Sequence, residues 1–168
     1  LTIAMNTELG ITLFDKSQIK IMVVDDQPLL RQALTDLLKK HVGFTIIGEA
    51  GNGKEAVRLA LERNPDVIIM DIAMPEMNGL EATRQIKERL PSIAILVLTI
   101  YDDPEDILGI LEAGAAGYLM KDVFGDVVVN AIKSIVAGER VLSENILNQV
   151  LKYARRYPIT PLRLDANE

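Results

Sequence analysis

Four stretches of the sequence end a short apolar run with polar residues: Val23-Val24-Asp25-Asp26, Ile68-Ile69-Met70-Asp71, Leu96-Val97-Leu98-Thr99 and Tyr118-Leu119-Met120-Lys121. Runs this short and this apolar are typical of strands buried in a parallel sheet. Polar residues at the carboxyl ends of such strands lie at the edge where open α/β sheets bind their ligands. We therefore expect three carboxylates, a hydroxyl and an ammonium group to share one pocket.

The rest of the sequence also alternates between apolar runs and segments of helical period, which predicts repeated βαβ units. Strands are expected near residues 19–24, 44–49, 67–70, 93–98 and 117–120. Helices are expected near residues 28–40, 53–63, 79–90, 104–113 and 125–137. The pattern therefore predicts one α/β domain with a five-stranded parallel sheet and five helices.

Residues typical of helix ends agree with these boundaries. Asn52, Asn78 and Asp103 precede predicted helices, where their side chains can accept hydrogen bonds from free backbone N–H groups. Gly114 and Gly138 follow predicted helices, where a left-handed backbone favours glycine.

The sequence changes character after Gly138. Ser143 is expected to cap a further helix, whose apolar stripe is formed by Ile146, Leu147, Val150, Leu151 and Ala154. Residues 157–161 are predicted to be an extended linker, because a residue that precedes proline is disfavoured in a helix. We therefore divide the chain into an N-terminal extension (1–17), the α/β domain (18–142) and a linker helix with its tail (143–168).

The overall charge argues against direct binding to nucleic acid or to an anionic membrane. The formal net charge is −6, whereas such binding relies on clustered Lys and Arg. The longest apolar stretch, residues 93–98, is far too short to span a bilayer as a helix. The sequence has no cysteine, which excludes disulfides and thiolate metal sites.

The polar residues at the strand ends have a coherent chemistry. Asp25, Asp26 and Asp71 would bring three negative charges together, which is costly without a compensating cation or proton. Carboxylate oxygens with room for water suit Mg²⁺, and also Mn²⁺. Phosphoryl transfer needs such a metal, a further cation and a hydrogen-bond donor, and Lys121 and Thr99 fit the last two roles. Asp71 is the best candidate nucleophile, since a carboxylate can form an acyl phosphate.

Four motifs surround these residues: Val23-Val24-Asp25-Asp26-Gln27-Pro28, Met70-Asp71-Ile72-Ala73-Met74-Pro75, Leu98-Thr99 and Gly117-Tyr118-Leu119-Met120-Lys121-Asp122. Together they closely resemble the receiver domains of two-component response regulators, from about residue 19 to residue 142. The stretches 48–53, 77–83 and 113–119 are most similar to the NarL/FixJ, or LuxR-type, class of transcriptional regulators.

The resemblance implies a flavodoxin-like fold with strand order 2-1-3-4-5, followed by a linker helix. It also implies that Asp71 accepts a phosphoryl group from a sensor histidine kinase. Asp26 and Asp71 would bind Mg²⁺ directly, together with the backbone carbonyl of Ala73, and Asp25 would help through water. A domain of this kind modifies itself and is not a turnover enzyme.

The resemblance further implies a conformational switch. The hydroxyl of Thr99 would move to the phosphate and the ring of Tyr118 would follow it inward, while Lys121 would complete the phosphorylation site. The residue after the switch hydroxyl is often small in receivers, and here it is Ile100. We therefore expect restricted access to the acyl phosphate and slow hydrolysis.

Partners are also expected from the resemblance. The class usually carries a helix-turn-helix output domain, but residues from 159 onward match its start poorly and few remain. DNA contact is thus expected only through an output domain absent from this chain. The apolar stripes of the last two predicted helices favour a homodimer, and the location expected is the bacterial cytoplasm, with no membrane contact.

Three alternative functions are less consistent with the sequence. Residues 48–54 match the first seven positions of a P-loop, but Glu55 stands where a Ser or Thr should hold Mg²⁺. A phosphatase with an aspartyl nucleophile needs a second acid two residues after it, and Ala73 occupies that position. A degenerate receiver that only binds partners fits less well, because every key polar position is filled.

Overall fold

The structure is a computed structural model that describes residues 18–122 and 125–156. Within these residues the strands form one six-stranded parallel sheet in the order β2-β1-β3-β4-β5-β6. The strands are β1 Ile19–Val24, β2 Phe44–Ala50, β3 Val67–Met70, β4 Ala94–Thr99, β5 Gly117–Met120 and β6 Val141–Leu142. The predicted order 2-1-3-4-5 is confirmed, and β6 extends the sheet beyond it.

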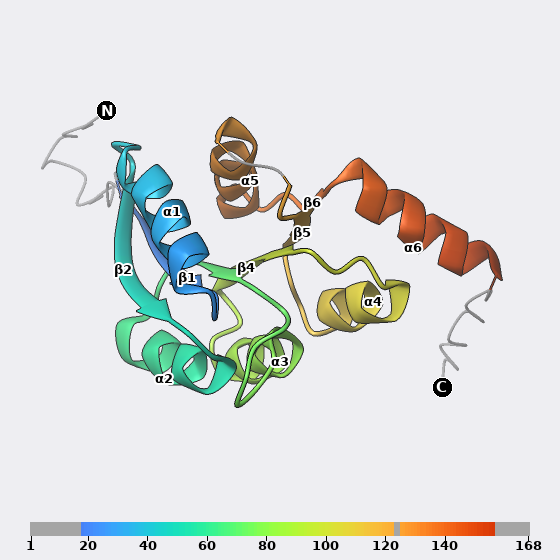
Figure 1. The fold of residues 1–168 in the computed structure, drawn as a ribbon, viewed down its shortest axis with the longest axis horizontal. Coiled ribbons are helices and arrows are strands. Elements are labelled where there is room, and N and C mark those ends of the chain that lie inside the picture. The colour runs from blue at the N-terminus through green and yellow to red at the C-terminus, as the bar shows by residue number, and fades with distance from the viewer. Residues whose placement is uncertain (1–17, 123–124, 157–168) are drawn as a thin grey trace, which may run out of the picture.

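The helices are α1 Pro28–Lys39, α2 Gly53–Arg63, α3 Gly79–Arg89, α4 Pro104–Glu112, α5 Asp126–Val136 and α6 Glu144–Arg156. Helices α1 and α5 cover one face of the sheet, and α2, α3 and α4 cover the other, as Figure 1 shows. Each face has its own apolar cluster, and the central strands are buried on both sides. This burial explains their continuous apolar runs.

The predicted helix ends are confirmed in detail. The side chains of Asn52 and Asn78 accept backbone N–H bonds of 2.8 and 2.9 Å from the first turns of α2 and α3. Asp103 does the same for α4 at 2.9 Å. Gly114 and Gly138 follow α4 and α5 with φ angles of +106° and +91°, which residues with a side chain rarely adopt.

The end of the domain differs from the prediction. Strand β6 was not expected, and it pairs Val141 with Gly117 and Leu142 with Tyr118. The predicted side-chain cap by Ser143 is wrong, because its hydroxyl is buried and has no hydrogen-bond partner among the described residues. The backbone of Ser143 is used instead, since its N–H donates to the carbonyl oxygen of Tyr118 at 3.2 Å.

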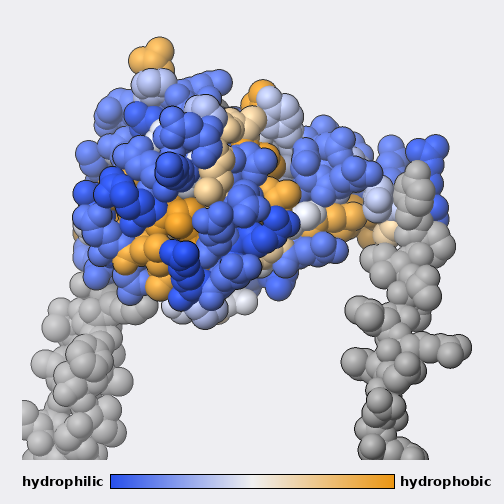
Figure 2. All heavy atoms as spheres, turned by 90° about the horizontal axis from the view of Figure 1, so that it is seen from below, coloured by the Kyte–Doolittle hydropathy of each residue, from blue (hydrophilic) through white to orange (hydrophobic). Residues whose placement is uncertain are grey.

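Helix α6 leaves the edge of the sheet beside α4 and projects from the domain (Figure 1). The residues of its predicted apolar stripe lie in two different environments. Ile146 is fully buried in the cluster on the α4 side and Val150 packs against that cluster, whereas Leu147 and Leu151 remain 43% and 47% exposed. Figure 2 shows apolar side chains along this projecting arm on an otherwise largely hydrophilic face.

The expected extension at residues 1–17 and the expected linker at residues 157–161 lie outside the described residues. Among residues 18–122 and 125–156, no helix has both the length and the hydropathy needed to cross a membrane.

Candidate functional site

The carboxyl edge of the sheet brings the three predicted aspartates together. Asp25 and Asp26 follow β1, and Asp71 follows β3, which is paired directly with β1. One carboxylate oxygen of each residue lies within 4.8 Å of the others. Asp25 and Asp71 are only 4% and 5% exposed, while Asp26 is open to solvent. The cluster therefore has two buried charges and one accessible charge.

Lys121, which was expected to share a pocket with the aspartates, lies between the two buried carboxylates. Its Nζ is 2.7 Å from Oδ2 of Asp25 and 3.1 Å from Oδ2 of Asp71. The backbone places it there, because Lys121 follows β5 and its N–H donates to the carbonyl oxygen of Thr99 at 2.8 Å. The single ammonium group of Lys121 thus neutralises only part of the negative charge of Asp25 and Asp71.

The titration of these groups reflects this imbalance. Burial raises the pKa of Asp71 above its usual value, the charge of Lys121 opposes that rise, and the charge of Asp25 adds to it. For Lys121, burial lowers the pKa, but the hydrogen bond to Asp25 and the charge of Asp71 outweigh it and raise the pKa. The site is thus electrostatically suited to a further cation.

The loop after β3 holds Asp71 in place. Oδ1 of Asp71 accepts a 2.8 Å hydrogen bond from the backbone N–H of Ile72. The N–H of Gly79, at the start of α3, donates to the carbonyl oxygen of Ile72 at 2.8 Å. A Cβ atom at position 79 would overlap the carbonyl oxygen of Asp71. Glycine at this position therefore allows the loop to close tightly around the candidate nucleophile.

Arg31 is part of the site and was not predicted. Its Nη1 donates to the carbonyl oxygen of Asp25 at 2.7 Å, and its Nε lies 3.6 Å from Oε1 of Glu49. The backbone N–H of Gln27 donates to Oδ1 of Asp25 at 2.9 Å. Arg31 thus holds the backbone of Asp25, and the N–H of Gln27 holds its carboxylate. No local pattern in the sequence indicates this role of Arg31, because it depends on a contact with a backbone carbonyl.

These groups open into a pocket of about 420 Å³. Its lining includes Asp26, Asp71, Lys121, Ala73, Gln27, Leu30, Ile100 and Tyr101. Ala73, whose backbone carbonyl was expected at the metal, thus lines the same space as the carboxylates. Ile100, which was expected to restrict access to an acyl phosphate, lines this pocket and is itself 62% exposed.

Thr99 and Tyr118 are connected through a third residue. Both are fully buried. The backbone N–H of Tyr101 donates to Oγ1 of Thr99 at 3.3 Å, and the hydroxyl of Tyr118 donates to the carbonyl oxygen of Tyr101 at 2.8 Å. Burial, and then the charges of nearby aspartates led by Asp106, raise the pKa of Tyr118, so its hydroxyl stays protonated. No pattern in the sequence indicates the backbone role of Tyr101.

The P-loop alternative does not fit the geometry. In a P-loop, the backbone N–H groups after the glycines cradle a phosphate. Here the N–H of Gly53 donates to the carbonyl oxygen of Met77 at 3.0 Å, and a Cβ at position 53 would overlap that oxygen. The glycine allows close approach of the loop before α3, and the candidate phosphate cradle is filled by the protein itself.

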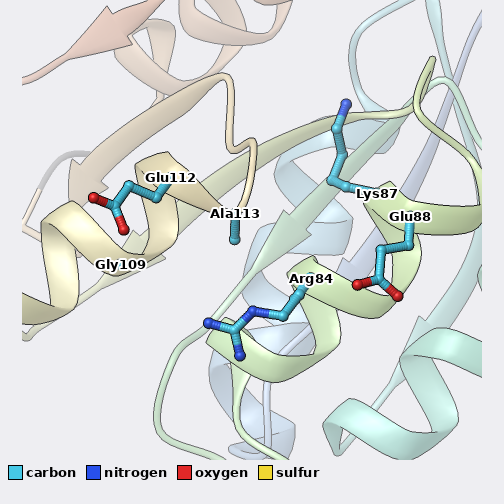
Figure 3. A pocket seen from close by; sticks show the side chains of 6 residues that line it. All are labelled: Arg84, Lys87, Glu88, Gly109, Glu112 and Ala113. Carbon is cyan, nitrogen blue, oxygen red and sulfur yellow. The ribbon is translucent and has the colours of Figure 1, made fainter. Parts of the chain in front are cut away.

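A second hollow, of about 480 Å³, lies between α3 and α4 (Figure 3). It is lined by Arg84, Lys87, Glu88, Gly109, Glu112 and Ala113. Its cations are already engaged, because Lys87 donates to the carbonyl oxygens of Pro91 and Ile93, and Arg84 pairs with Glu81 at 2.8 Å. This hollow has no group poised for chemistry comparable with the acidic pocket.

Comparison with known proteins gives a consistent result. Residues 21–133 match the family model described as the response regulator receiver domain. The transcriptional regulatory protein LnrK of Bacillus subtilis (strain 168) is 41% identical over 138 residues, which are 82% of this chain and 63% of LnrK. The nitrate/nitrite response regulator protein NarL of Escherichia coli (strain K12) is 36% identical over 148 residues, which are 88% of this chain and 68% of NarL.

A solved structure also matches closely. The crystal structure of a LuxR-family two-component response regulator from Aurantimonas sp. SI85-9A1 has a TM-score of 0.78 and 34% sequence identity, and the match covers 83% of this chain and 99% of that one. The chain spans only about 60% of the length of curated relatives such as DegU of Brevibacillus brevis. The similarity therefore concerns the α/β domain and its acidic pocket.

Proposed function

Because this chain belongs to the family of response regulator receiver domains, we propose that Asp71 accepts a phosphoryl group from a sensor histidine kinase in a Mg²⁺-dependent reaction. The single observation that carries the proposal is the pairing of Lys121 with both Asp25 and Asp71 beside an open pocket. A buried carboxylate next to a fixed cation is suited to attack on phosphorus, since the cation can balance the charge that develops on the phosphoryl oxygens.

The donor set fits Mg²⁺. Asp26 and Asp71 would bind it directly with the backbone carbonyl of Ala73, and Asp25 would act through water. Three carboxylates with one ammonium leave net negative charge in the pocket, and hard oxygen ligands with solvent access are those that Mg²⁺ prefers. When bound, the metal would neutralise charge on the phosphoryl oxygens.

In the transfer step, one carboxylate oxygen of Asp71 forms a bond to phosphorus as the bond from phosphorus to the donor's leaving group breaks. The kinase histidine leaves with the electron pair of its broken P–N bond. Lys121, now beside one oxygen of the phosphoryl group, exchanges its pairing with Asp71 for a pairing with that oxygen. Asp71 is thereby converted from a carboxylate to an acyl phosphate, and the net charge of the pocket becomes more negative.

The same pocket supports a switch rather than turnover. We propose that the hydroxyl of Thr99 donates to the phosphoryl group and that Tyr118 follows it inward, to the buried position that its ring has in this structure. The position two residues after Asp71 is Ala73, so this pocket lacks the general acid that an aspartyl phosphatase would use on a foreign substrate. The domain signals by its own modification.

The output is proposed to be transcription, because the relatives named above are transcriptional or response regulators of bacteria. DNA would then be bound by an output domain outside this chain, and the protein would act in the bacterial cytoplasm. Homodimerisation is proposed from the exposed apolar residues of α5 and α6, which include Val127, Val136, Leu147 and Leu151.

The test is to incubate the protein with Mg²⁺ and acetyl phosphate and to weigh the intact chain. We expect a gain of one phosphoryl group, which is lost in Asp71→Asn and when the Mg²⁺ is chelated. Asp126→Asn is the matched control, because Asp126 is an exposed aspartate on α5. No gain, or a gain that survives Asp71→Asn, would refute the proposal.

A further inference from the structure

The start of α6 is joined to the residue proposed as the switch. Strand β6 pairs Leu142 with Tyr118, and the N–H of Ser143 donates to the carbonyl oxygen of Tyr118 at 3.2 Å. Immediately afterwards, Ile146 inserts into the apolar cluster that contains Tyr118, and it is fully buried there. The helix therefore begins on the backbone of Tyr118 and is anchored in the apolar cluster to which the Tyr118 side chain belongs.

The rest of α6 packs along α4. Val150 lies against the same cluster, to which α4 contributes Ile107 and Ile110. Towards the end of α6, Lys152 and Arg156 line one pocket with acidic residues at the start of α4. The contact between α6 and α4 thus has a small apolar part, centred on Ile146, and a charged outer end. The other apolar side of α6, with Leu147 and Leu151, stays exposed. An interface with one fully buried side chain can open without unfolding the domain.

A chain of hydrogen bonds connects this anchor to the acidic pocket. The hydroxyl of Tyr118 donates to the carbonyl of Tyr101, and the N–H of Tyr101 donates to the hydroxyl oxygen of Thr99. A hydroxyl that accepts one hydrogen bond can still donate another. Thr99 can therefore donate to a phosphoryl group on Asp71 while it keeps Tyr101 and Tyr118 in their present positions.

We propose that α6 is a phosphorylation-sensitive strap whose docking on α4 and β5 requires the buried position of Tyr118. The inference rests on the proposed function and adds to it a regulated element outside the phosphorylation site. A Tyr118 ring that left its buried position would loosen the cluster that receives Ile146. Phosphorylation fixes Thr99 and hence Tyr118, so it favours docked α6, and by reciprocity docked α6 favours phosphorylation.

The lack of native cysteine makes docking directly measurable. Ile146→Cys places the only thiol of the chain in the anchor, and its rate of reaction with an aromatic disulfide reagent reports the opening of α6. We expect Mg²⁺ with acetyl phosphate to slow this reaction at least about fivefold, the lower end of typical coupling between sites. Ile135→Cys, buried in the opposite cluster on α5, is the control for global opening and should not change.

A reciprocal measurement keeps the test independent of the thiol variant. Ile146→Asp should undock α6 and lower the rate of phosphorylation by acetyl phosphate, whereas Asn148→Asp, at an exposed position on the same helix, should leave that rate unchanged. The strap is refuted if Ile146→Cys is phosphorylated, as detected by mass, but the reaction rate of its thiol does not change. It is also refuted if the two Asp variants are phosphorylated at equal rates. Absence of any phosphoryl gain in the unaltered chain is the different outcome that refutes the proposed function itself.

Discussion

Lys121→Met removes the ammonium group from between two buried carboxylates and keeps an apolar stem of similar length. The lost contacts are those at 2.7 Å to Asp25 and 3.1 Å to Asp71, whose side chains are both 6% exposed. Removing one partner of a buried ion pair costs about 3–5 kcal/mol, because the remaining charge has no compensation. Since Lys121 also lines an open pocket, we expect the lower end of this range, a loss of about 3 kcal/mol in the free energy of unfolding at pH 7.

The loss should depend on pH in a defined direction. Without Lys121, whose charge lowers the pKa of Asp71, the folded-state pKa of Asp71 lies further above the unfolded value. Such groups destabilise the folded protein only where they are charged, so the penalty appears as the pH rises above about 4 and is absent below it. Mg²⁺ should recover more stability in the variant than in the unaltered chain, since a bound cation takes over the role of the ammonium group.

Urea unfolding at pH 4, 5.5 and 7, with and without Mg²⁺, measures these effects. Lys133→Met, at an exposed position on α5, is the matched control and should change the free energy of unfolding by less than about 0.5 kcal/mol. A loss below about 1 kcal/mol in Lys121→Met, in the range of a surface ion pair, would refute the reasoning, and so would a loss independent of pH.

Three further outcomes are expected. Gly79→Ala should lower the free energy of unfolding by about 2–4 kcal/mol and slow phosphorylation, because the new methyl displaces the backbone of Asp71. Gly109→Ala is the control, because its methyl meets only a flexible leucine side chain, and it should be neutral or stabilising by up to about 1 kcal/mol. Similar losses of unfolding free energy in both variants would contradict the role of the close approach at Gly79. Ile100→Ala should shorten the lifetime of the acyl phosphate severalfold, as followed by intact mass after removal of acetyl phosphate; an unchanged lifetime counts against shielding by Ile100. Asp71→Asn without Mg²⁺ should raise the melting temperature at pH 7, because burial and the charge of Asp25 raise the pKa of Asp71 and make its charged form costly. The gain in melting temperature should vanish near about pH 4, and a gain that persists there contradicts this cause.

Much of the fold could be predicted because its signals are strong and local. Strands β1, β3, β4 and β5 are nearly continuous apolar runs that are largely buried, and each predicted boundary lies within one residue of the observed one. The caps Asn52, Asn78 and Asp103 are short-range devices that depend on a few neighbouring residues. The position of the acidic cluster follows from parallel topology, which brings the carboxyl ends of adjacent strands to one edge.

The features that escaped prediction are made by backbone groups or by distant contacts. A two-residue strand such as β6 carries no periodicity, and it forms because β5 offers an open edge. Ser143 resembles a cap in sequence, but its backbone is committed to Tyr118. Arg31 and Tyr101 act on or through carbonyl groups, so their residue types did not identify them. Such roles depend on the tertiary structure and leave no local pattern.

Strand β6 also affects how two copies of the chain could associate. An uncovered β5 would present free backbone groups that could pair with the same strand of another molecule and build a continuous intermolecular sheet. Val141 and Leu142 occupy this edge at Gly117 and Tyr118, and the chain then turns directly into α6. A two-residue strand is too short to serve as a template in its turn. Self-association by edge-to-edge strand pairing is therefore blocked on this side of the sheet, and the proposed dimer would here use contacts between helices.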